Sequence, residues 1–91
     1  MIQLQKFAKL YWEVDNMAVH PLLTKQYAKS IYQYGTRRFT DRDEYEGIPT
    51  EYHESVKQYA AANFTLELID NALDQTWINQ TEYDETIAYM T

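Results

Sequence analysis

The chain has 91 residues, with 14 acidic and eight basic residues, two histidines and no cysteine, for a formal net charge of −6 at pH 7. A chain of this length suits one domain, which buries only about 60% of its unfolded surface and is therefore expected to be modestly stable or supported by self-association. The missing cysteines exclude a disulfide framework and a thiolate metal site, and no apolar run is long enough to predict a signal peptide or a membrane span.

The first predicted element is an amphipathic helix over about residues 2–14. Its apolar stripe has the three- and four-residue spacing of one helical face: Leu4, Phe7, Leu10, Tyr11 and Val14. A second helix is predicted over residues 22–34, because Pro21 suits a first helical turn and Gly35 suits a left-handed stop. The face expected to be buried carries Leu23, Tyr27, Ile31 and Tyr34.

The third predicted helix, over residues 41–47, is short and acidic. Either Thr40 or Asp41 could cap it, and Gly47 is expected to end it. Its neighbouring carboxylates are interpreted as first-turn residues that favour the positive end of the helix dipole, not as an acid and base pair.

A fourth helix is predicted over residues 50–62. Its buried spacing includes Tyr52, Val56, Tyr59 and Ala60. Asn63 is expected to adopt a left-handed conformation that ends the helix. No segment alternates with a period of two for long enough to predict a strand.

The last third of the chain predicts a helical hairpin. Thr65 can cap a helix over residues 65–75, and Asn79 with Glu82 can form a capping box that starts a helix over residues 80–90. The apolar positions of the two helices are Leu66, Ile69, Leu73, Tyr83, Ile87 and Met90, and the turn between them carries Trp77 and Ile78.

These elements together predict an all-α fold, a small bundle of four to six short helices in a single domain over residues 1–91. The core is expected to contain Phe7, Leu10, Ile31, Val56, Ile69, Leu73, Trp77 and Ile87. Residues 22–48 and 63–90 could be an imperfect repeat, two related hairpins with the N-terminal helix beside them, because a threonine precedes the turn by the same distance in each. Duplication and coincidence both stay open.

A pattern over the last third of the chain matches one protein family. The residues that carry it are Lys57, Tyr59, Asn63, Thr65, Ile69, Leu73, Thr76, Trp77, Ile78, Asn79, Glu82, Tyr83 and Ile87. This pattern resembles the XkdX family, short proteins encoded in the tail modules of phages and prophages of Gram-positive bacteria. The chain departs from the family at Thr76, where glycine is usual. The family has no catalytic residues, so the resemblance implies a setting and not a reaction.

The net charge lies in the C-terminal part of the chain. Residues 1–57 carry eight basic and eight acidic residues, whereas residues 58–91 carry six acidic residues and no basic one. A solvated face is the ordinary explanation, and a surface for a basic partner, or a mimic of DNA phosphates, is the sharper one. The residues predicted to bind a protein partner are Asp70, Asp74, Glu82, Glu85 and Tyr89. Because phosphate contacts need cations, this surface is not expected to bind nucleic acid.

No pattern predicts a reaction. His20 and His53 are far apart in the sequence, and a metal site would need a third ligand that no spacing indicates. There is no glycine-rich phosphate loop and no nucleophile with a base, so we expect no metal, no cofactor and no enzyme activity. One cluster of basic residues would make a weak surface for an acidic partner or nucleic acid: Lys25, Lys29, Arg37, Arg38 and Arg42.

Two functions of different class remain. The first is a small non-enzymatic phage or prophage protein of the tail module, which acts by protein–protein interaction in virion structure or assembly. The second is an acidic phage or mobile-element protein that binds and inhibits a host protein, as an anti-defence protein or DNA mimic would. Either would be a soluble protein in the host cytoplasm or the virion, not secreted by its own signal and not bound to a membrane. A second copy of the chain is an alternative partner.

Overall fold

The computed structural model describes residues 19–90, which form four α-helices and one short 3-10 helix. The α-helices are α1 (Pro21–Tyr32), α2 (His53–Asn63), α3 (Leu66–Asp74) and α4 (Gln80–Ala88), and η1 (Thr50–Tyr52) leads into α2. Residues 19–90 contain no strand, so the predicted all-α fold is confirmed. The helix predicted over residues 2–14, with the predicted core residues Phe7 and Leu10, lies outside the described residues.

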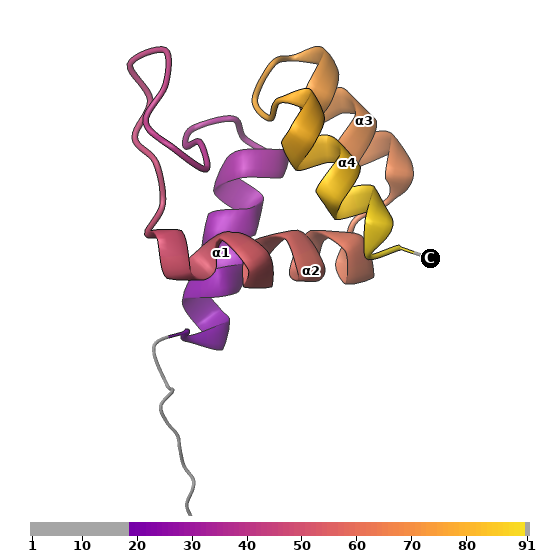
Figure 1. Ribbon diagram of the computed structural model, residues 1–91, viewed down its shortest axis with the longest axis horizontal. Helices are drawn as coiled ribbons and strands as arrows, with labels where there is room; N and C mark the ends of the chain where they lie inside the picture. Colours follow the sequence, from indigo (N-terminus) through magenta and orange to yellow (C-terminus); the bar gives the residue numbers. More distant parts are fainter. Residues whose placement is uncertain (1–18, 91) are drawn as a thin grey trace, which may run out of the picture.

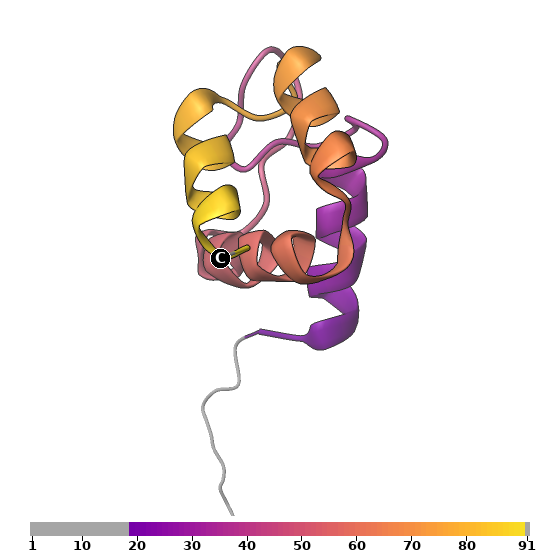
Figure 2. The same cartoon turned by 90° about the vertical axis from the view of Figure 1, so that its right-hand side faces the viewer.

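The four α-helices pack in a ring around the core. α1 packs against α2 and α3, and α4 closes the ring because it packs against the same two helices. Figure 1 shows α2 crossing α1 while α3 and α4 run side by side, and Figure 2 shows α1 and α4 on opposite sides of the molecule. No helix in the described part of the chain is long and apolar enough to cross a membrane.

The residues at the start of α1 and just after its end have side chains or backbone angles that suit those positions. His20 is extended, and its Nδ1 accepts a hydrogen bond from the amide of Leu22 at 3.1 Å. Pro21 is the first helical residue, where no backbone donor is needed. Gly35 has a φ of 66°, the predicted left-handed conformation, and without a Cβ it lies directly against the indole of Trp77.

The buried face of α1 differs from the predicted one. Its buried residues are Thr24, Ala28, Ile31 and Tyr32. Of the predicted face only Ile31 is fully buried, whereas Leu23 and Tyr34 are 37% and 63% exposed. Thr24 can be buried because its hydroxyl donates to the carbonyl of His20 at 3.1 Å, which satisfies the polar group.

The prediction of a helix over residues 41–47 is wrong. This part of the chain is a loop, with isolated bridges between Arg38 and Gly47 and between Arg42 and Tyr45. Asp43 and Glu44 have positive φ angles of 54° and 70°, which a right-handed helix excludes. Asp41 does not cap a helix, because its Oδ1 accepts from the amide of Gly47 at 2.7 Å and closes the loop. Such local side-chain bonds compete with a helix.

The helix predicted over residues 50–62 is confirmed as η1 followed by α2, but its predicted end is wrong. Asn63 is the last residue of α2, and Phe64 after it is extended, with φ −103° and ψ 153°. The left-handed stop is therefore absent from Asn63. Its side-chain amide instead donates to the carbonyl of Tyr59 at 3.0 Å, which satisfies one carbonyl at the helix end.

Helices α3 and α4 form the predicted hairpin with the predicted caps. The hydroxyl of Thr65 accepts from the amide of Leu68 at 3.2 Å. Asn79 and Glu82 form the capping box through two hydrogen bonds of 2.8 Å each. In the turn, Thr76 has a φ of 64°. A β-branched residue is strained there, whereas glycine would adopt this conformation without steric cost.

The buried apolar core draws residues from α1, α2, α3 and the connecting segments. Among the predicted core residues, Ile31, Val56 and Ile69 are fully buried, while Leu73, Trp77 and Ile87 are partly buried and pack against the core. Phe39 and Ile48 are also in the core, although they lie in the loop after α1. Neither is among the predicted core residues, because both lie outside the predicted helices, where no helical spacing marks a buried face.

The suggested repeat has a structural counterpart only in its first half. Gly35 and Thr76 occupy equivalent places and have nearly equal φ angles of 66° and 64°. The second helix expected after Gly35 is the loop described above. A common origin of residues 22–48 and 63–90 stays a prediction.

Candidate interaction surface

Helix α4 is attached to α2 through polar contacts. Its fully buried residue is Thr86, and the fully buried apolar core takes no residue from α4. The Nζ atom of Lys57 in α2 lies 2.5 Å from an oxygen of Glu85 and 3.4 Å from an oxygen of Glu54. The hydroxyl of Tyr89, just after α4, donates to the other oxygen of Glu54. One cation, two carboxylates and one phenol therefore join the two helices.

The charges of this network stabilise one another. Lys57 is only 6% exposed. Burial by itself would lower the pKa of Lys57, but the hydrogen bond and charge of Glu85, with the charge of Glu54, outweigh burial and raise the pKa. The pKa of Glu54 is lowered, first by the hydrogen bond from Tyr89 and then by the charge of Lys57. Both Lys57 and Glu54 are consequently charged at neutral pH.

A buried pair of hydroxyl groups joins α4 to α1. The hydroxyls of Tyr32 and Thr86 lie 2.6 Å apart, and both residues are fully buried. Thr86 donates its hydrogen to the carbonyl of Glu82 at 2.8 Å, so the hydroxyl of Tyr32 is the donor in the pair. Burial raises the pKa of Tyr32 well above its usual value, which keeps the phenol neutral.

A tyrosine and a carboxylate join α3 to α4. The hydroxyl of Tyr83 donates to Oδ1 of Asp70 at 2.6 Å. This hydrogen bond is the largest cause of a raised pKa of Tyr83, because it stabilises the neutral phenol. Asp70 therefore takes part in holding the hairpin together.

The structure places the five predicted partner-binding residues on or beside the hairpin, but four of them have partners within the fold. These four are Asp70, Glu82, Glu85 and Tyr89. Asp74 is exposed and has no hydrogen bond or ion pair among residues 19–90. These contacts show that three of the four predicted carboxylates also hold the fold.

The remaining acidic charge faces water on both helices of the hairpin. Glu67 and Asp74 are exposed on α3, and Asp84 is exposed on α4. Asp84 accepts a hydrogen bond only from Gln80 of its own helix, at 2.8 Å. We call Glu67, Asp74 and Asp84 the outer acidic set. Because residues 58–91 contain no basic residue, no neighbour in the hairpin neutralises this set.

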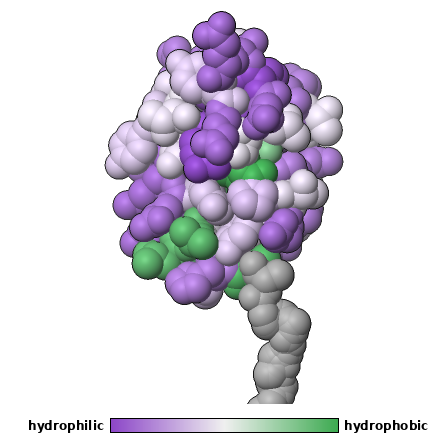
Figure 3. Space-filling view, turned by 90° about the vertical axis from the view of Figure 1, so that its left-hand side faces the viewer, coloured by the Kyte–Doolittle hydropathy of each residue, from purple (hydrophilic) through white to green (hydrophobic). Residues whose placement is uncertain are grey.

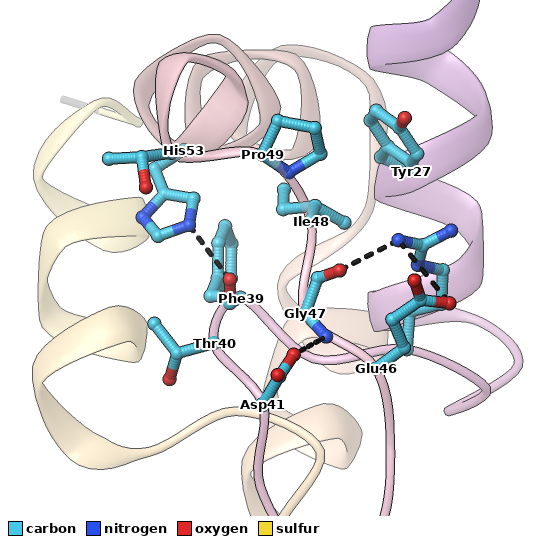
Figure 4. A pocket seen from close by; sticks show the side chains of 11 residues that line it. Tyr27, Phe39, Thr40, Asp41, Glu46, Gly47, Ile48, Pro49 and His53 are labelled. Atoms are coloured by element: carbon cyan, nitrogen blue, oxygen red, sulfur yellow. Dashed lines mark hydrogen bonds and ion pairs between the residues drawn. The ribbon is translucent and has the colours of Figure 1, made fainter.

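A second feature is an open groove of about 670 Å³ between α1, the loop and the start of α2 (Figure 4). Tyr27 lines one side and His53 the other, with Pro49 between them. The guanidinium of Arg37 lies 5.1 Å from the centre of the Tyr27 ring, and its Nη2 donates to the carbonyl of Gly47 at 2.7 Å. The groove combines an aromatic wall with a cation that is already hydrogen-bonded to the loop.

The polar groups of the groove hold the loop in place. The Nε2 atom of His53 lies 2.8 Å from the carbonyl oxygen of Phe39, and because a carbonyl only accepts, this nitrogen carries the hydrogen. Asp41 is bonded to the amide of Gly47. In the described part of the chain no three side chains of the ligating types are grouped to hold a metal ion. The geometry thus assigns these residues a structural role.

The arginines of the predicted cluster of basic residues stabilise the loop. Arg38 is 4% exposed, donates to the carbonyl of Gly35 at 2.9 Å and lies 4.0 Å from the centre of the Tyr45 ring. Arg42 donates to the carbonyl of Thr76 at 2.9 Å and ties the loop to the hairpin turn. Sequence reasoning missed the groove and this role. No local signal revealed them, because Gly47 and the Ile48-Pro49 pair also suit the end of a helix.

Comparison of the chain with models of protein families, with curated proteins and with solved structures finds no match. The outer acidic set is a surface feature that no base within the hairpin compensates, and the groove is a concave one.

Proposed function

We propose that the protein is a small non-enzymatic component of a phage or prophage tail module, which acts in virion structure or assembly by binding another protein. The contact surface is the outer side of the α3–α4 hairpin. It comprises the outer acidic set, with Tyr89 at the end of the hairpin. The partner presents basic residues to it.

The outer acidic set is the observation that carries this proposal. Its three carboxylates are exposed on adjacent helices, and the hairpin has no base to offset them. Lys57, which contacts α4, is already paired with Glu54 and Glu85, and Arg42 contacts the hairpin turn through the carbonyl of Thr76. A basic partner would be attracted to these uncompensated carboxylates.

The resemblance of the hairpin to the XkdX family supplies the tail setting. Thr76 adds a structural point in its favour. The family usually has glycine at this place, and Thr76 has the left-handed φ of 64° that glycine adopts most easily. A left-handed residue at the place where the family usually has glycine supports the alignment of the two patterns.

The experiment is affinity capture from lysates of infected cells, read by mass spectrometry at low and high salt. The test variant combines Glu67→Gln, Asp74→Asn and Asp84→Asn, which changes three charges and leaves the α2–α4 network intact. The matched control combines Asp43→Asn, Glu44→Gln and Glu51→Gln, which changes three charges outside the hairpin. Circular dichroism checks that both variants keep the fold.

The parent protein and the control variant should recover a protein encoded in the tail module, and the test variant should recover less of it. Recovery from the parent should fall as salt rises, because exposed charges are screened beyond about 8 Å at physiological ionic strength. Equal recovery with all three proteins would exclude the hairpin as the contact surface. Absence of any tail-module protein would refute the tail assignment.

The acidity of the same surface also favours the alternative, an inhibitor that imitates DNA phosphates. Its distinguishing result would be capture of a host nucleic-acid-binding protein that DNA displaces. Gene neighbours separate the two functions independently: tail fibre, baseplate or holin genes favour the first, and early or anti-defence genes favour the second.

A further inference from the structure

Three large apolar side chains at the start of α1 are exposed, and we call them the entry patch. Val19 is 39% exposed, Leu22 is 55% exposed and Leu23 is 37% exposed. Leu22 and Leu23 lie in the first turn of α1, and Val19 precedes the helix by two residues. Figure 3 shows hydrophobic residues at the lower left of the molecule and, separately, beside the start of the coloured chain. Clustered exposed apolar residues commonly mark a covered or contacting surface.

The chain enters the fold at a fixed point beside this patch. The amide of His20 donates to the hydroxyl of Tyr52 at 2.9 Å, and the carbonyl of His20 accepts from the hydroxyl of Thr24 at 3.1 Å. Because consecutive Cα atoms are about 3.8 Å apart, the residues that precede Val19 must begin at the patch. Eighteen residues precede it.

Those eighteen residues contain the apolar stripe that the sequence predicts: Leu4, Phe7, Leu10, Tyr11 and Val14. Residues 15–18 connect the stripe to the entry patch, and this length lies within the usual range of about two to eight residues for a connection between packed helices. Glu13 and Asp15 would then approach the positive end of the α1 dipole, whose first turn has no acidic residue.

We propose that the apolar stripe of the N-terminal segment, from Leu4 to Val14, docks on the entry patch of the same chain. The patch is then an intramolecular docking surface and not the partner surface of the hairpin. This inference does not depend on the proposed function, because it concerns the opposite end of the chain. A second copy of the chain and a foreign protein are the competing occupants.

The test uses the full chain, which has no cysteine of its own. One variant carries Leu22→Cys in the entry patch. Its matched control carries Leu66→Cys on α3, where the leucine is 48% exposed. The rate of reaction with a maleimide reports how accessible each thiol is. Each variant is then combined with Phe7→Ser and Leu10→Ser, which break the stripe, or with Gln5→Ser and Lys9→Ser, which lie opposite it by helical phase.

The thiol at position 22 should react at least about tenfold more slowly than the thiol at position 66, because a docked segment must open first. Breaking the stripe should remove this difference, the substitutions opposite the stripe should keep it, and neither rate should depend on protein concentration. Equal rates in the chain with an intact stripe would overturn the proposal. So would slow reaction that survives the broken stripe, or protection that appears only at high protein concentration, which would identify a second copy as the cover.

Discussion

Replacing Gly35 by alanine should be among the most destabilising single substitutions in the described part of the chain. A Cβ at this position would lie 2.6 Å from Cδ2 of the Trp77 indole and closer still to Cε2 and Nε1. The φ of 66° adds a steric cost of about 1–2 kcal/mol for any residue with a Cβ. Crowding of a packed contact adds about 1–3 kcal/mol. The two costs together predict a loss of about 2–5 kcal/mol in the free energy of unfolding.

Urea titration followed by circular dichroism at 222 nm measures this loss. The midpoint should fall while the slope stays unchanged, because the surface exposed on unfolding is the same. Gln33→Ala is the matched control: its φ of −102° suits alanine, so its effect should stay within about 0.5 kcal/mol. A double variant with Trp77→Leu separates the two costs, since in that background Gly35→Ala should cost only about 1–2 kcal/mol. A loss below about 0.5 kcal/mol in the single variant would refute the reasoning.

Four further outcomes follow from the same contacts. Thr76→Gly should raise the free energy of unfolding by about 0.5–1 kcal/mol, measured by urea titration, because glycine accepts a φ of 64°. Ile69→Ala should lower it by about 2–5 kcal/mol in the same assay, because Ile69 is fully buried. The pKa values of Tyr32 and Lys57 are raised in the fold above the unfolded values of 10.0 and 10.5. Their contribution to the free energy of unfolding is therefore complete below the unfolded pKa values and is lost as the pH rises through the folded ones. The thermal midpoint should fall above about pH 10. The pKa of Glu54 is lowered in the fold below 4.5, so its contribution to stability is present above that pH and is lost as the pH falls through the folded pKa. Glu54→Gln should therefore reduce the fall of the thermal midpoint at acidic pH.

The elements that could be predicted from the sequence are those whose determinants lie within a few residues of each other. Thr65 bonds to an amide three residues later, and Asn79 with Glu82 forms a box of four residues. Such signals survive in any tertiary context, and the caps were found where they were expected. The hairpin and the all-α class were predictable for this reason.

The loop after α1 could not be predicted because distant residues hold it. His53 bonds to the carbonyl of Phe39, and Arg42 bonds to the carbonyl of Thr76, across 14 and 34 positions of the sequence respectively. Local propensity permits a helix over residues 41–47, but these tertiary contacts and the bond from Asp41 to Gly47 override it. The groove depends on this loop and was missed with it.

The candidate surface was predictable in its location and not in its detail. Sequence reasoning placed the uncompensated charge on the hairpin, but it could not separate the carboxylates that bond within the fold from those that face water. Asp70 and Glu85 bond to a tyrosine and a lysine that only the packing of the helices brings near. Asp74 has no such contact in the described part and stays available.

Partner binding and the attachment of α4 should be coupled through this charge. α4 packs Tyr83 and Ile87 against the core, and Lys57 with the carboxylates around it adds a charged contribution to its attachment. One lysine offsets the charges of Glu54 and Glu85, while the outer acidic set continues to repel them. A basic partner would lower this repulsion more when α4 is packed on α2 than when α4 is detached, because packing brings the carboxylates together. By linkage, the free energy by which the bound partner stabilises the packing of α4 must equal the free energy by which the packing of α4 strengthens binding of the partner.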